Sequence, residues 1–172
     1  AMGETMKRYA HLADLEARML RVDRVVILRL YRPAQNSDEL HMVTRFVDHA
    51  HRECGQSVIM LALPAPGLAP PEEHIRGLVV RNIKQRFQNG TIEHAVLVVP
   101  SGSAIRRAVV RSVFTGARLV LGLPNRILIV EGLDEATDHI SSRFGISADT
   151  LIAPCRTLID HHPAQKTVDS PP

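Results

Sequence analysis

The residues best suited to bind a ligand are Ser101-Gly102-Ser103, with Arg106 one helical turn further on. Ser103 is placed to cap a helix that begins at Ala104, so backbone N–H groups, the positive end of a helix dipole and a guanidinium converge on one turn. This arrangement favours an anion. The glycine patterns of nucleotide-binding loops and the G-x-S-x-G frame of a nucleophilic serine are both missing from it. We therefore predict a binding site, with no catalytic residues, at Ser101, Gly102, Ser103 and Arg106.

The same predicted helix, residues 103–121, carries more apolar surface than a single stripe requires. One apolar side suits packing on a sheet, and a second side contains Val110 and Phe114. Three candidates can cover this second side: the C-terminal segment around Leu151 and Leu158, another subunit, or an apolar ligand. We predict an interface whose arginines set the register against acidic residues of the partner. Its residues are Arg107, Val110, Arg111, Phe114 and Arg118.

Histidine and cysteine residues gather on another predicted helix, which runs from about residue 37 to 54. His49 and His51 are two residues apart and diverge, whereas metal ligands on a helix converge at spacings of three or four. Cys54 continues the apolar stripe, and Asp48 belongs to a mixed-charge side that is expected to face solvent. We predict no metal site and no cofactor. Because Cys54 and Cys155 lie far apart with no C-x-x-C pattern, both are expected to be reduced thiols.

Apolar strands and amphipathic helices alternate along the chain and must position these residues. Asn36 is expected to cap the helix of residues 37–54 with Glu39 in the capping-box position, and Gly55 is expected to end it. The stretch of residues 4–20 fits either a helix or an edge strand. The predicted strands are 25–30, 58–63, 95–99 and 126–130, and the predicted helices lie within 37–54, 71–88, 103–121 and 133–144.

This alternation calls for an α/β fold with a mostly parallel sheet covered by helices. The chain has 172 residues, of which 45% are hydrophobic and 23% charged, as expected for one globular domain. We predict a single small domain with a mixed, mostly parallel sheet of four to five strands and about four helices. The expected divisions are a tag remnant and N-terminal arm (1–11), the α/β domain (12–146), a C-terminal packed segment (147–162) and a flexible tail (163–172). Within the packed segment a short helix is one alternative, and Pro154 is expected to interrupt it.

The element order resembles the STAS-like, or SpoIIAA-like, superfamily of small α/β domains, which includes anti-sigma-factor antagonists and other bacterial proteins. The resemblance rests on Ala95–Ser101, Ile105–Ala108, and Arg126–Val130 leading into Leu133–Ala136, and it covers residues 12 to 144. It implies that the ambiguous N-terminal stretch is an edge strand. The antagonists carry a phosphorylated serine where their second parallel strand meets its helix, but Leu63–Ala69 has no hydroxyl group there. The resemblance therefore implies the architecture without that phosphorylation switch.

These observations predict a non-enzymatic, cytoplasmic regulatory or scaffolding protein that acts through protein contacts and forms a homodimer. The alternative is a protein or enzyme that binds an anionic or apolar small molecule near Ser101–Ser103 and the connector 64–70, at the carboxyl ends of the strands. Nucleic-acid binding is not expected, because aromatic residues make up only 3% of the chain and the net charge of +3 is spread among acids. No apolar run approaches the roughly 18 residues of a membrane span.

Overall fold

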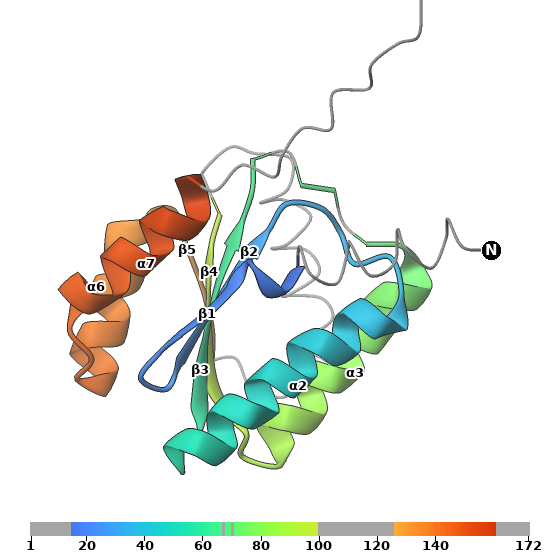
Figure 1. Cartoon of the computed structure of the whole chain (residues 1–172), viewed down its shortest axis with the longest axis horizontal. Helices are drawn as coiled ribbons and strands as arrows, with labels where there is room; N and C mark the ends of the chain where they lie inside the picture. Colours follow the sequence, from blue (N-terminus) through green and yellow to red (C-terminus); the bar gives the residue numbers. More distant parts are fainter. Residues whose placement is uncertain (1–14, 67, 70, 100–125, 161–172) are drawn as a thin grey trace, which may run out of the picture.

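Five strands form one mixed sheet in the order β1-β2-β3-β4-β5 (Figure 1). The computed structural model describes residues 15–66, 68–69, 71–99 and 126–160. β1 pairs antiparallel with β2, and the remaining neighbours are parallel. This confirms the predicted α/β domain with a mostly parallel sheet. The strands are β1 (Met19–Val22), β2 (Val25–Leu30), β3 (Val58–Pro64), β4 (Ile92–Val98) and β5 (Ile127–Val130).

In the described part of the ambiguous N-terminal stretch, Leu15 and Glu16 are helical and Met19 and Leu20 belong to the edge strand β1, so the edge strand that the resemblance implied is present only at the end of the stretch. A tight turn at Asp23 and Arg24 joins β1 to β2, so that Val22 and Val25 face each other across the hairpin. Asp23 adopts the left-handed conformation there, with φ of 54°. Aspartate tolerates this conformation better than most residues, which suits it to the turn.

Four helices among the described residues cover the two faces of the sheet (Figure 1). α2 (Ser37–Cys54) and α3 (Glu73–Gln88) lie on one face, and α6 (Leu133–Phe144) and α7 (Ala148–Asp160) lie on the other. Each face has its own apolar core. The α2/α3 core is built from Val26, Val47, Ala50, Val58, Phe87 and Ile92. The core on the other face includes Ile27, Leu61, Val96, Ile140, Leu151, Cys155 and Leu158.

The predicted ends of α2 are confirmed. Asn36 Oδ1 accepts a hydrogen bond from the Glu39 backbone N–H at 3.1 Å, which satisfies a donor that the first turn leaves open. Gly55 ends the helix with φ of 65°, where a side chain would be strained. The Glu39 carboxylate is buried and accepts from the Gln35 N–H at 2.6 Å. Hydrogen bonds to the side chains of Asn36 and Glu39 therefore fix the backbone at the N-terminus of α2.

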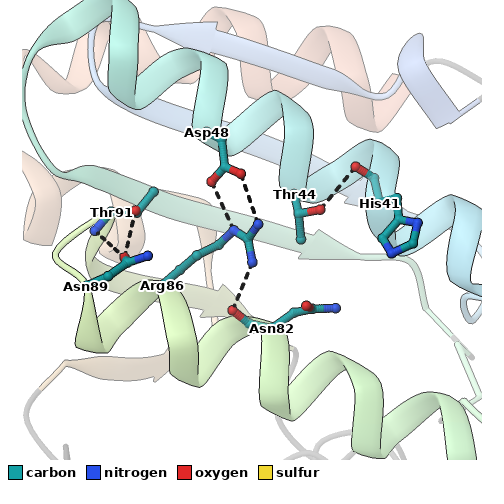
Figure 2. Close-up of polar contacts among 7 residues, drawn as sticks. All are labelled: His41, Thr44, Asp48, Asn82, Arg86, Asn89 and Thr91. Carbon is teal, nitrogen blue, oxygen red and sulfur yellow. Dashed lines mark hydrogen bonds and ion pairs between the residues drawn. The ribbon is translucent and has the colours of Figure 1, made fainter.

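An ion pair joins α2 to α3 (Figure 2). Arg86 Nε and Nη2 donate to the two carboxylate oxygens of Asp48 at 3.1 and 3.0 Å, and Nη1 donates to the Asn82 carbonyl at 3.3 Å. Asp48 was expected to face solvent, and its side chain is 36% exposed but also forms this ion pair. Its position on the helix was correctly inferred, but α3 lies against that side of α2 and supplies the cation.

The C-terminal helix α7 packs on α6 and on the β1–β2 end of the sheet. Leu151, Cys155 and Leu158 are at most 2% exposed. The short helix that was one alternative for this segment is therefore confirmed, but Pro154 lies inside α7, so the expected interruption there is wrong. Proline removes one helical hydrogen bond, but the buried side formed by these three residues holds the helix on both sides of it. Burial raises the pKa of the Cys155 thiol to about 12, which keeps it protonated.

Among the described residues, none of the helices combines the length and the apolar character that crossing a membrane requires.

Candidate functional site

The predicted ligand residues Ser101, Gly102, Ser103 and Arg106 lie outside the described residues. So do the predicted interface residues Arg107, Val110, Arg111, Phe114 and Arg118. The structure does locate the end of the strand that precedes them. β4 ends at Val98, and the Val99 N–H donates to the Val130 carbonyl at 2.8 Å. The chain therefore leaves β4 at the carboxyl edge of the parallel strands, where ligands bind in open α/β sheets.

Two arginines and a tyrosine form a cluster at this edge, beside β2. The Arg29 N–H donates to the Arg18 carbonyl at 3.0 Å, which extends the β1–β2 pairing by one residue pair. Side chains that lie directly opposite each other on antiparallel strands share one face of the sheet. The Arg18 and Arg29 guanidinium carbons lie 3.9 and 4.9 Å from the centroid of the Tyr31 ring. Two cations thus contact one aromatic ring.

Backbone carbonyl groups accept hydrogen bonds from two members of this cluster. Arg29 Nη1 donates to the Leu63 carbonyl at the end of β3, at 3.1 Å. The Tyr31 hydroxyl donates to the Leu158 carbonyl in the last turn of α7, at 3.3 Å. The nearby carboxylate of Glu39 pairs with Arg32 Nη2 at 2.7 Å. The cluster therefore lies where two strands and the C-terminal end of α7 meet.

A second cluster lies at the opposite, amino edge of the sheet, under α6. His94 Nε2 on β4 is 3.0 Å from His139 Nε2 on α6. His94 is only 2% exposed, and its ring also contacts Phe144. A register shift between β3 and β4 skips Glu93, so that Ile92 pairs with Val58 and His94 with Ile59. An extra residue in one strand re-aims the side chains around it, and here it leaves His94 facing α6.

A hydrogen bond between the two rings needs one donor and one acceptor nitrogen, so at least one of the two imidazoles must be neutral. His94 Nδ1 is buried and has no hydrogen-bond partner among the described residues. A proton on that nitrogen would be an unsatisfied buried donor, which favours the tautomer in which His94 Nε2 donates to His139. Burial lowers the pKa of His94 to about 4, and the charge of Arg143 and the His139 ring act in the same direction. Burial and Arg143 also lower the pKa of His139.

The histidines and cysteine of α2 do not converge. His49 Nε2 lies 3.5 Å from Glu53 Oε2, and His51 Nδ1 lies 2.8 Å from the Gln56 carbonyl. Cys54 is half-buried and belongs to neither apolar core, and its sulfur accepts a hydrogen bond from Arg21 Nη1 at 2.8 Å. Across the part of the chain that the structure describes, no three histidine, cysteine or acidic side chains are grouped as a metal site requires.

Sequence reasoning missed both clusters that the structure reveals. Arg29 is the charged residue within the apolar run Val-Val-Ile-Leu-Arg-Leu, and a cation in a strand expected to be buried was a usable signal. His94 gave a weaker signal, because it precedes the apolar run of β4 and its partner is 45 residues away. Neither Arg18 nor His139 carries a local sign of its contacts.

Comparisons with known proteins place the chain in no established group. No family model matches it, and neither the curated proteins nor the solved structures include a match. The STAS-like resemblance therefore stays a prediction, and function has to be argued from the chain's own residues.

Proposed function

We propose that the protein is a non-enzymatic regulatory module of STAS-like type that acts through protein contacts and self-associates through the second apolar side of residues 103–121. The observation that carries this proposal is the location of α7. The apolar side of α7 is already buried against β1, β2 and α6. α7 was the main alternative to a partner as the cover of residues 103–121, and these contacts argue against that alternative.

The order of the strands supports the proposal that α7 does not cover residues 103–121. β2, β3, β4 and β5 are neighbours in chain order, and all three pairings are parallel. Connections between parallel strands keep one handedness, so successive crossovers in one direction run over the same face. α2 and α3 make the first two crossovers and share a face. We therefore expect the third crossover, which includes residues 103–121, on that face as well.

The apolar residues of α7 point to the other face. Leu151, Cys155 and Leu158 belong to the same core as Ile27, on the α6/α7 side of the sheet (Figure 1). A helix cannot bury one apolar stripe on both faces of a sheet. We therefore propose a partner, rather than α7, as the cover of the second apolar side of residues 103–121, with Val110 and Phe114. An exposed apolar surface of this kind is typical of protein–protein contacts.

Charges on α3 support a second copy of the chain as that partner. Glu72 and Glu73 lie exposed at the N-terminus of α3, and the Glu72 side chain is 83% exposed. These acids lie on the face where the third crossover is expected. Arg107, Arg111 and Arg118 of one copy can pair with them on another, which would orient the contact without adding much affinity.

The proposal is tested by substituting Phe114 with aspartate in the full chain and measuring molar mass by light scattering. Burying an aspartate in an apolar contact leaves an unpaired charge, so Phe114→Asp is expected to shift the mass from dimer toward monomer. Circular dichroism is expected to stay unchanged. Ser142→Asp is the matched control, because it adds the same charge at an exposed position on α6.

Two results would overturn the proposal. A wild-type mass equal to one chain at every concentration would remove the dimer. A Phe114→Asp variant with an unchanged dimer mass would move the contact to another surface. If Phe114→Asp does not fold, Val110→Ser, a milder change on the same side, is measured in its place and is expected to weaken the dimer at least tenfold.

A further inference from the structure

We infer that the outer edge of β5 pairs with β5 of a second copy of the chain, antiparallel and across a two-fold axis at Leu128. The two sheets then continue into one. The pairing rests on the self-association proposed above, since it supplies a backbone contact within the same dimer.

The hydrogen bonds between β4 and β5 show which residues face this edge. β5 lies at the end of the sheet and pairs with β4 alone among the described strands. The N–H groups of Ala95 and Val99 donate to the carbonyl groups of Arg126 and Val130, each at 2.8 Å. Leu128 lies midway between these two acceptors. Because successive residues of a strand direct their N–H and C=O groups to opposite edges, Leu128 also bonds to β4, and the residues on either side of it face outward.

The outward-facing residues are Ile127 and Ile129, and no described strand lies beyond them. Exposed edges are normally protected by charged side chains, proline or a bulge. β5 is short, but its four residues are all apolar and pair with β4 without a register shift. Ile127, Leu128 and Ile129 are half-buried, whereas Ile59 and Leu61 of β3 are 0% exposed. The edge is therefore suited to pairing with another strand.

One register uses all the outward-facing backbone groups. It places Ile127 of each copy opposite Ile129 of the other, and each of these two pairs exchanges two hydrogen bonds. Leu128 then meets its own counterpart on the two-fold axis. The faces of the sheet also agree, because Ile127 packs with the α2/α3 core and Leu128 with the core on the other face. A two-fold axis perpendicular to the sheet keeps each face continuous, and a shift of two residues leaves one hydrogen-bonded pair instead of two.

A second copy fits this edge better than an unrelated peptide does. In the two-fold register each outward group donates or accepts once, with no other chain required. Four hydrogen bonds between short strands are few for a stable dimer, so an adjoining surface has to contribute. Residues 103–121 belong to the crossover from β4 to β5 and are expected on the face that Ile127 lines. The edge and the second apolar side of this crossover are therefore expected to form one interface.

The test is sedimentation equilibrium of the full chain with Ile129→Pro. Proline lacks the outward N–H of this position and leaves the hydrogen bonds to β4 in place, because those come from Leu128 and its alternate neighbours. The change removes two of the four hydrogen bonds across the axis and is expected to weaken the dimer at least about tenfold. Ile129→Val is the matched control, because it keeps the N–H and most of the side chain, and it should dimerise as the wild type does.

The results separate this pairing from the proposed function. If Phe114→Asp lowers the mass and Ile129→Pro does not, the edge pairing is wrong and the proposed surface stands. If Ile129→Pro lowers the mass and Phe114→Asp does not, the edge pairing stands and the surface of residues 103–121 is wrong. A loss of mass in both variants supports both contacts, and a wild-type chain that is monomeric at every concentration overturns both. Equal dissociation of Ile129→Val and Ile129→Pro also refutes the backbone pairing.

If Ile129→Pro does not fold, the pairing is tested by mild oxidation of Leu128→Cys in a Cys54→Ser background. Cys155 is buried and stays unchanged. Residues opposite each other in a non-hydrogen-bonded pair have Cα atoms about 4.5 Å apart, which is within the range of a disulfide. Leu128→Cys is expected to form a covalent dimer. Arg126→Cys is the matched control, because the register separates its two copies by about 13 Å along the strands. No cross-link at Leu128→Cys, or equal cross-linking of both variants, would contradict the pairing.

Discussion

The buried His94–His139 pair predicts a loss of stability in mild acid that a single substitution should remove. His94 is 2% exposed, and burial with Arg143 and His139 lowers its pKa from the ordinary 6.5 to about 4. Because the pKa is lower in the folded chain than in the unfolded one, folding favours the neutral imidazole. This contribution is complete above pH 6.5 and is lost as the pH falls toward 4.

The size of the effect follows from the two pKa values. The interval from 6.5 to about 4 corresponds to roughly 3 kcal/mol of unfolding free energy, of which about 2.5 kcal/mol is lost by pH 4.5. The neighbouring Glu93 carboxylate opposes this by raising the pKa of His94. It is itself paired with Arg24 Nη1 at 2.7 Å.

The assay is urea unfolding of the wild type and His94→Gln at about pH 7.5 and pH 4.5. The wild type is expected to lose about 2.5 kcal/mol more than His94→Gln over that interval, because glutamine does not titrate. His41→Gln, at an exposed position on α2, is the matched control and should follow the wild type. Parallel pH profiles for the wild type and His94→Gln would refute the reasoning.

Two further predictions concern the helices that cover the other face. Asn36→Ala removes the side-chain cap of α2 and is expected to lower the unfolding free energy by about 1 kcal/mol in urea, while Asn36→Asp keeps the cap and should stay near the wild type. A double-mutant cycle with Asp48→Ala and Arg86→Ala is expected to give a coupling of about 1 kcal/mol, since the pair is bidentate but the Asp48 side chain is 36% exposed. A larger loss from Asn36→Asp than from Asn36→Ala, or additive effects in the cycle, would contradict these two accounts.

Local signals in the sequence predicted the elements well. Asn36 and Gly55 mark the ends of α2, and α6 runs over Leu133–Phe144 as its periodicity predicted. These positions depend on capping groups and backbone conformations that neighbouring residues determine. α3 begins at Glu73, two residues after the expected start at Pro71. β4 begins at Ile92, three residues before its predicted start at 95. The order of β2, α2, β3, α3, β4, β5 and α6 was therefore predicted from local signals, with shifts of a few residues at some ends.

Contacts between distant segments could not be predicted in the same way. Arg18 meets Arg29 only because of the register of the β1–β2 hairpin, and one residue of slippage would place them on opposite faces. His94 reaches His139 because Glu93 is skipped in the β3–β4 pairing, an irregularity without a local sequence signal. Pro154 misled the prediction for α7, because tertiary packing outweighs the loss of one hydrogen bond. Register and packing, rather than propensity, determine these sites.

Sedimentation equilibrium of the wild-type chain tests the central claim most directly. The account predicts a mass that approaches twice the 19.0 kDa of one chain as the concentration rises through tens of micromolar, and a mass near that of one chain for Phe114→Asp under the same conditions. A wild-type mass of 19.0 kDa at every concentration would contradict it.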